Sequence, residues 1–338
     1  MSSPRFDILT PDDLRSLTLP PTLEDADGGA RRLLIVDLGD GKPLSPTDAA
    51  PTVAWLRTQS AVVIGVRDEP HGAHPLDPGA DVILARHELD ACAQAIERNP
   101  VAASVLVQVL RTTEHLAPQD ALVVESLAYA TLQAGEEHRA WLAAERARQP
   151  ARVLPARSDL VLLERRAATL HVCLNSPDTR NSLSSAMRDA LAEAFTLVAM
   201  DTSIAAVAVT ANGPCFSAGG DLKEFGLAPD PASAHAIRMQ RMPARLLLLR
   251  RNVYGFHVHG ACIGAGIELP AFARRLTARA DTIFRLPEVA MGLIPGAGGC
   301  VSLPRRIGRQ RTAQMALTGT AIGAEQALAW GLVDAIEP

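Results

Sequence analysis

Short apolar runs alternate with helical segments through the second half of the sequence, and this alternation limits the fold more than any other feature. Strands are expected at residues 160–166, 169–174, 204–210, 253–258 and 282–286. Helices are expected between them, at residues 183–200, at residues 231–250 with an interruption at Pro243, and from Ala265 onward. The first two strands form a hairpin around Ala167 and Ala168. Repeated strand-helix units predict a mainly parallel sheet covered by helices, which is an α/β fold.

The first half of the chain predicts a second unit. Apolar runs at residues 33–38 and 61–66 indicate buried strands around a helix at residues 47–58, a βαβ-like fragment. Residues 87–148 follow with apolar positions at helical spacing, and two prolines are expected to divide them into three helices. These prolines are Pro100 and Pro118.

Two segments of different composition border this unit. Residues 1–31 are rich in Asp, Pro and Gly and predict an extended arm, with one short helix starting near residues 10–13. Residues 148–157 are rich in Pro and Arg and predict a linker. We therefore expect an arm, a unit over residues 32–150 and a second unit over residues 157–338.

Charge and cysteine content exclude several classes of function. The formal net charge is −4 and no block of Lys or Arg occurs, so neither a nucleic acid nor an anionic membrane surface is an expected partner. The five cysteines are scattered without a CxxC pair, which argues against a disulfide framework or a zinc site. No run of about 18 apolar residues is present. These features predict a soluble cytoplasmic protein with a small-molecule partner.

Three glycine-rich segments lie where expected strands lead into helices, at residues 215–223, 260–268 and 286–299. Glycine permits close backbone approach, and the first amides of a helix have no partner within it. Two such segments facing one pocket would offer two N–H donors to a thioester oxygen that becomes enolate-like. Tight packing alone also explains a glycine at a junction. A dinucleotide site is disfavoured, because no third glycine follows Gly264 and Gly266 at the required spacing.

Two glutamates beside these segments suggest acid-base chemistry. Glu268 falls in the first turn of the helix that begins at Ala265, and Glu288 follows an apolar strand. Taken singly, the first carboxylate could only cap a helix and the second could only be a solvated loop residue. As a pair they fit the addition of water, in which one carboxylate deprotonates water and the other acid protonates carbon.

These motifs together resemble the crotonase, or enoyl-CoA hydratase and isomerase, superfamily over residues 157–338. The matching segments are residues 175–183, 216–223, 260–268, 287–288 and 292–299. The resemblance implies a crotonase-like spiral of ββα units. It also implies that the amides of Gly220 and Ala265 bind the thioester oxygen, that Glu268 activates water and Glu288 protonates the α-carbon, and that the amide of Gly296 helps to hold the water.

The resemblance further implies an acyl-CoA thioester as substrate. Coenzyme A then enters as part of the substrate, and no metal or redox cofactor is expected. Arg180 and Lys223 match positions near the CoA phosphates, Ala218 lies on the loop that meets the adenine, and Asp221 is assigned to the same CoA-binding loop. A homotrimer or a dimer of trimers is the assembly implied.

The family's terminal helices have no counterpart after residue 338, whereas residues 87–148 resemble them. We hypothesise that residues 32–150 are a degenerate crotonase-like fragment whose helices stand in for that tail. An unrelated helical appendage is the alternative. The predicted reaction is syn addition of water to a 2-enoyl-CoA. Δ3-Δ2 isomerisation or another crotonase-type reaction, and a non-catalytic CoA-thioester-binding protein, are the rival interpretations.

Overall fold

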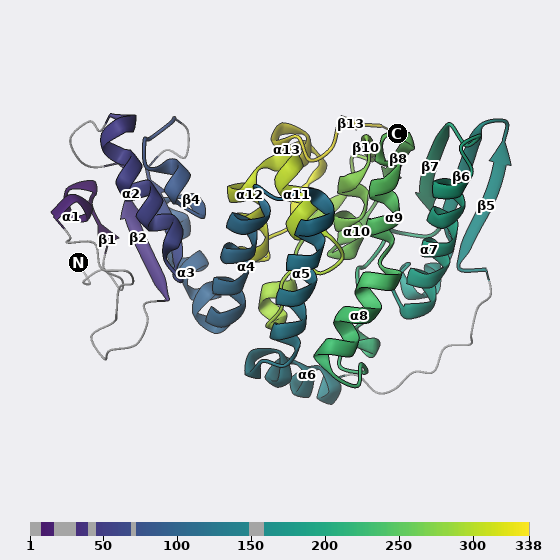
Figure 1. Ribbon diagram of the computed structural model, residues 1–338, viewed down its shortest axis with the longest axis horizontal. Coiled ribbons are helices and arrows are strands. Elements are labelled where there is room, and N and C mark those ends of the chain that lie inside the picture. The colour runs from purple at the N-terminus through teal and green to yellow at the C-terminus, as the bar shows by residue number, and fades with distance from the viewer. Residues whose placement is uncertain (1–7, 17–31, 40–44, 69–71, 149–158, 338) are drawn as a thin grey trace.

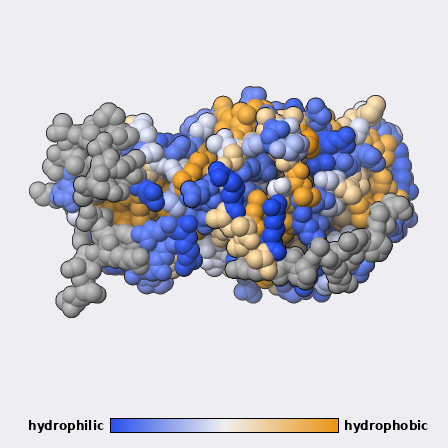
Figure 2. Space-filling view, turned by 90° about the horizontal axis from the view of Figure 1, so that it is seen from below, coloured by the Kyte–Doolittle hydropathy of each residue, from blue (hydrophilic) through white to orange (hydrophobic). Residues whose placement is uncertain are grey.

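The molecule is elongated, with one β-sheet at each end and helices between them (Figure 1). The computed structural model describes residues 8–16, 32–39, 45–68, 72–148 and 159–337. Seen from below, the outline is equally long, and hydrophilic residues form much of the surface (Figure 2). Among the described helices, none has the length and apolar character needed to cross a membrane. The predicted linker falls almost entirely outside the described residues.

The sheet near the N-terminus has four parallel strands in the order β1-β2-β3-β4. Its elements are β1 (Ile8–Leu9), α1 (Pro11–Ser16), β2 (Leu33–Asp37), α2 (Pro46–Thr58), β3 (Val62–Arg67) and β4 (Val82–Ala85). The predicted βαβ fragment and the short helix are confirmed. Of the predicted arm, residues 1–31, only residues 8–16 are described, and there β1 adds a strand to the sheet, which the sequence did not predict. β4 was not predicted.

Four helices follow, where the sequence predicted three. They are α3 (Leu89–Arg98), α4 (Pro100–Thr113), α5 (Pro118–Gln133) and α6 (Glu136–Arg148). Pro100 and Pro118 start helices as expected, since proline lacks the N–H that has no partner there anyway. The prediction of three helices was wrong because the chain also breaks at Gly135, whose amide donates to the carbonyl oxygen of Leu132 at 2.8 Å.

The second half builds a six-stranded sheet in the order β13-β10-β8-β7-β6-β5, in which only the β5-β6 pair is antiparallel. The strands are β5 (Val161–Arg166), β6 (Thr169–Leu174), β7 (Ala206–Ala211), β8 (Tyr254–Val258), β10 (Arg275–Ala278) and β13 (Ala335–Ile336). The predicted hairpin is confirmed, and Ala167 adopts a positive φ of 52° in its turn. A small sheet pairs β12 (Ile322–Gly323) with β11 (Ile283–Arg285) and β11 with β9 (Ala261–Ile263).

Seven further helices cover these sheets within the described residues. They are α7 (Ser185–Met200), α8 (Pro231–Arg241), α9 (Pro243–Leu249), α10 (Ala265–Glu268), α11 (Gly299–Ile307), α12 (Arg309–Thr318) and α13 (Ala324–Trp330). The interruption predicted at Pro243 separates α8 from α9. The mainly parallel α/β arrangement predicted from the sequence is thus present.

The two halves share a core. Helices α4 and α5 pack against α11, α3 packs against α12, and one cluster of buried apolar side chains runs from β2 to the six-stranded sheet. The buried carboxylate of Asp81, next to β4, joins them electrostatically. It accepts hydrogen bonds from Arg111 on α4 and from Arg309 on α12, the latter at 2.9 Å. The helices of the first half are therefore joined to the second half by apolar packing and by a buried ion pair.

Candidate active site

The two predicted acids come together because β9 and β11 are parallel neighbours. Ile263 pairs with Arg285, so both strands end at the same edge of the small sheet. Glu268 follows β9 on α10, and Glu288 starts a 3₁₀ helix, Glu288–Met291, just after β11. A methyl group added to Gly264 would collide with Oε1 of Glu288 and would lie 3.7 Å from Oε1 of Glu268. The two carboxyl groups thus flank one point on the backbone.

The glycine-rich segment at residues 215–223 lies unusually close to β9. Ser217 bridges to Cys262, and the amide of Ile263 donates to the Ser217 carbonyl oxygen at 3.1 Å. A Cβ atom on Gly219 would lie 2.6 Å from the Ile263 carbonyl oxygen, and one on Gly266 would lie 2.6 Å from that of Ser217. Only glycine allows this approach.

The close approach brings two free amides to one place. Among the residues that the structure describes, the backbone N–H groups of Gly220 and Ala265 have no hydrogen-bond acceptor. Backbone donors inside a protein are nearly always paired, so two unpaired donors, on the buried Ala265 and the half-buried Gly220, are available to a ligand oxygen.

All five predicted catalytic residues line a single cavity of about 470 Å³. They are Gly220, Ala265, Glu268, Glu288 and Gly296. The apolar part of the wall includes Leu183, Phe225, Ile237 and Met242. The structure therefore brings together residues that lie as much as 76 positions apart in the chain.

The residues predicted to contact CoA are less closely grouped. Asp221 lines the cavity, but its Oδ1 accepts a hydrogen bond from the amide of Lys223 at 3.1 Å and so caps the 3₁₀ turn Leu222–Glu224. Arg180, Ala218 and Lys223 do not line it. The carbonyl oxygen of Arg180 accepts from the amide of Ala218 at 2.9 Å, and the Arg180 and Lys223 side chains are on the surface.

Glu268 is buried, and backbone amides hold its carboxylate. Its Oε2 accepts hydrogen bonds from Ala297 N at 2.7 Å and Gly299 N at 2.8 Å, at the start of α11. Burial raises the pKa of Glu268 to about 7, against the two amides, which lower it. At neutral pH this carboxyl group can therefore exist in its charged form and can accept a proton.

Glu288 has the opposite surroundings. Its Oε2 is buried and has no hydrogen-bond partner among the described residues. Burial raises the pKa of Glu288 well above its ordinary value, and repulsion by Glu268 raises it further. The neutral acid is favoured at this position. The environments of the two glutamates thus differ in the way that an acid and a base require.

The structure adds residues that the sequence did not single out, and two come from the first half of the chain. Glu125 on α5 is 2% exposed, and its oxygens accept from Gly298 N at 2.7 Å and Cys300 N at 2.8 Å. Tyr129, one turn later, lines the cavity, and its ring covers Gly296 so closely that no side chain fits there. The available signal was that Glu125 is the single charged residue of the stretch 121–132.

Arg238 on α8 completes this side of the cavity. Its guanidinium carbon lies 4.5 Å from the centre of the Tyr129 ring. Its nitrogens donate to Oγ and the carbonyl oxygen of Ser126 and to Oε1 of Gln133, so the side chain ties α8 to α5. Burial lowers the pKa of Arg238, whereas Tyr129 and Glu125 raise it. It is a positive charge that favours the charged form of the buried acid Glu125.

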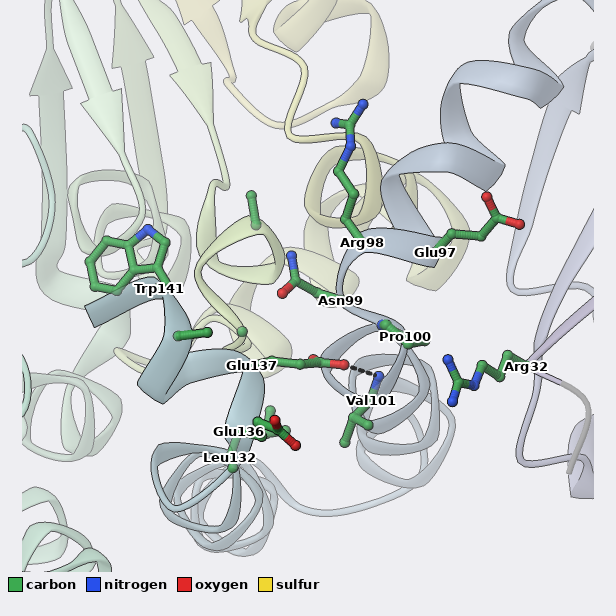
Figure 3. A pocket seen from close by; sticks show the side chains of 14 residues that line it. Arg32, Glu97, Arg98, Asn99, Pro100, Val101, Leu132, Glu136, Glu137 and Trp141 are labelled. Atoms are coloured by element: carbon green, nitrogen blue, oxygen red, sulfur yellow. Dashed lines mark hydrogen bonds between the residues drawn. The ribbon is translucent and has the colours of Figure 1, made fainter. Parts of the chain in front are cut away.

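A larger cavity of about 630 Å³ lies between α3, α4 and α6, and none of these groups lines it (Figure 3). Its most central acid, Glu137, already accepts hydrogen bonds from the amides of Val101 and Ala102 at 2.8 and 2.9 Å and caps α4. The smaller cavity, with its unpaired amides and acids, is therefore the candidate active site. Within the described ranges no group of three His, Cys, Asp or Glu residues is arranged to hold a metal ion.

Comparison with known proteins identifies relatives of the second half. The family model described as enoyl-CoA hydratase/isomerase matches residues 164–338. The 2,3-dehydroadipyl-CoA hydratase of Escherichia coli (strain K12) is 34% identical over 178 residues, which cover 53% of this chain and 69% of that protein. Enoyl-CoA isomerase/hydratase fer4 of Mycosarcoma maydis is 34% identical over 189 residues, covering 50% and 65%. The chain spans about two thirds of the length of these relatives.

A solved structure gives a similar alignment. The enoyl-CoA hydratase from Thermoplasma volcanium GSS1 is 32% identical, and the match covers 53% of this chain and 72% of that chain with a TM-score of 0.48.

The position of Gly264 yields a stability prediction. Its φ of 49° and ψ of −120° are accessible to glycine but strained for other residues, and a methyl group would displace Glu288. We expect Gly264→Ala to lower the free energy of unfolding by about 1–3 kcal/mol, measured by urea denaturation. The control is Gly323→Ala, because Gly323 has a φ of −82° and open space around its Cβ position. Equal stability of the two variants would contradict the strain argument.

Proposed function

Because the chain belongs to the enoyl-CoA hydratase/isomerase family of enzymes, we propose that its cavity adds water to the double bond of a 2-enoyl-CoA thioester. The observation that carries this proposal is the unequal environment of the two glutamates. Glu268 is held by two amides and Glu288 has a buried oxygen without a partner. Hydration needs a base and an acid at the same time, and these two groups can supply them.

The amides of Gly220 and Ala265 would bind the thioester oxygen. Addition of water to C3 pushes electrons through the double bond onto this oxygen, and the resulting enolate is stabilised most by donors that are already oriented. Both amides line the cavity and lack another acceptor among the described groups. They therefore need no rearrangement when negative charge develops.

The acids would transfer the two protons. Glu268 takes a proton from water as the water oxygen bonds to C3, and Glu288 delivers its proton to C2. Gly296, whose amide also has no acceptor among the described residues, is suited to orient the water. Because both carboxyl groups flank Gly264, both additions would occur on one face of the double bond, which is syn addition.

The substrate class follows from the relatives as part of the proposal. The relatives are named for 2,3-dehydroadipyl-CoA and for enoyl-CoA, and both names denote CoA thioesters. The side chains of Arg180 and Lys223 are exposed and are suited to contact the CoA phosphates. Ala218 would lie beside the adenine, and Asp221 shapes the loop. The proposed assembly is a homotrimer or a dimer of trimers.

Single substitutions distinguish hydration from isomerisation. We expect Glu268→Gln and Glu288→Gln each to lower kcat for hydration of a 2-enoyl-CoA by at least about 100-fold, because a general acid or base contributes about that much. Turnover is measured as the loss of the conjugated thioester absorbance. An isomerase would instead depend on Glu288 alone. The protein would therefore be an isomerase and not a hydratase if the unmodified chain does not hydrate a 2-enoyl-CoA and Glu268→Gln keeps full activity with a 3-enoyl-CoA.

The pH dependence tests the assignment of the base. Glu268 must be charged to accept a proton, and its pKa is about 7 instead of the ordinary 4.5. We therefore expect kcat/KM for hydration to fall as the pH is lowered through about 7. The residual activity of Glu268→Gln should not show this decrease. A profile that stays flat down to about pH 5 would contradict the assignment, since an ordinary glutamate would still be charged there.

A further inference from the structure

Four consecutive backbone amides at the start of α11 are shared between two buried carboxyl groups from opposite halves of the chain. Glu268 accepts hydrogen bonds from the first and third amides of residues 297–300, and Glu125 accepts from the second and fourth. The four donor-acceptor distances are between 2.7 and 2.8 Å. The hydrogen bonds that orient Glu268 are thus interleaved with those made by Glu125.

This segment has little conformational preference of its own. Three of the five residues from 296 to 300 are glycine, and Gly298 has a φ of 109°. Glycine occupies many backbone conformations at similar energy, so external acceptors must select the one that points alternate amides in opposite directions. Because each peptide unit is planar, an amide cannot turn without moving its neighbours. Fixing the second and fourth amides therefore fixes the first and third.

We propose that Glu125 is a positioning residue for the hydration reaction, which holds residues 297–300 so that two of their amides orient the carboxylate of Glu268 toward water. The inference rests on the proposed function. Glu125 does not touch the substrate in this account, since it does not line the cavity and both of its oxygens are occupied by amides. The side chain that prepares the base thus comes from α5, in the half of the chain outside the matched family region.

The charge of Glu125 is costly at this place, which argues against a simple helix cap. Burial raises the pKa of Glu125 well above its ordinary value, repulsion by Glu268 raises it further, and the amides of Cys300 and Gly298 lower it. The other titratable groups around it are Tyr129, Arg238, Glu288 and the thiol of Cys300. A neutral acceptor could cap α11 without a second acid next to Glu268, but only a carboxyl group offers a separate acceptor oxygen to each of two amides.

A double-mutant cycle tests the proposal in the full chain. Glu125→Gln leaves one acceptor for two amides, so we expect kcat for hydration to fall by about 10-fold to about 100-fold, while KM changes less than about threefold. In a Glu268→Gln background the same change should lower kcat by less than about threefold, because two residues that act as a unit are not additive. Both series are measured in the steady state, with a 2-enoyl-CoA in excess over the enzyme.

Thr113→Val is the matched control. Thr113 lies on α4, is fully buried at the same interface and donates a hydrogen bond to the carbonyl oxygen of Cys300 at 3.0 Å, but carries no charge and meets none of the four amides. We expect kcat to change by less than about threefold at a similar loss of thermal stability. If Glu125→Gln does not fold, Glu125→Asp carries the same test, since the shorter side chain cannot reach both amides.

The outcomes separate the two proposals. If the unmodified chain does not hydrate any 2-enoyl-CoA, the proposed function fails. If it does, and Glu125→Gln either keeps its kcat or lowers it equally in both backgrounds, the positioning role alone is overturned.

Discussion

The structure depends most on the amides of residues 297–300, which bind Glu268 from one half of the chain and Glu125 from the other. A helix start concentrates unpaired N–H groups and the positive end of the helix dipole, and this allows two carboxyl groups to be buried close together. Removing α5 would expose two of these amides and leave a glycine-rich segment without the acceptor that fixes it. The candidate site is therefore a product of both halves, although the family match covers only residues 164–338.

The same arrangement explains how one cavity can keep an acid and a base side by side. Two amides stabilise Glu268 as an anion, whereas Glu288 has one buried oxygen without a partner and is repelled by Glu268, so the two carboxyl groups favour opposite protonation states. Arg238 supplies one positive charge nearby, stacked on Tyr129 and held by α5. The helices of the first half thus shape the electrostatics of the site as well as its wall.

Much of this could be predicted from the sequence, because the relevant signals are local. The family, the α/β fold, the hairpin and the interruption at Pro243 follow from motifs and periodicity and are confirmed. The convergence of Glu268 and Glu288 on one cavity was predicted from the glycine-rich segments and the family resemblance, and the parallel pairing of β9 with β11 explains it in the structure. The break at Gly135 and the part played by Glu125 were missed. Glu125 lies 173 residues from the amide of Gly298, and no local pattern reports a contact of that range.

The most direct test of this account is the activity of the second half alone. Residues 152–338 contain every predicted catalytic residue but lack α3–α6, including Glu125 and Tyr129. Expressed by itself, this fragment should show no measurable hydration of a 2-enoyl-CoA under conditions in which the full chain turns over. A stable fragment with kcat within about tenfold of the full chain would contradict the claim that the first half completes the site, since loss of a fixed catalytic geometry costs about 100-fold.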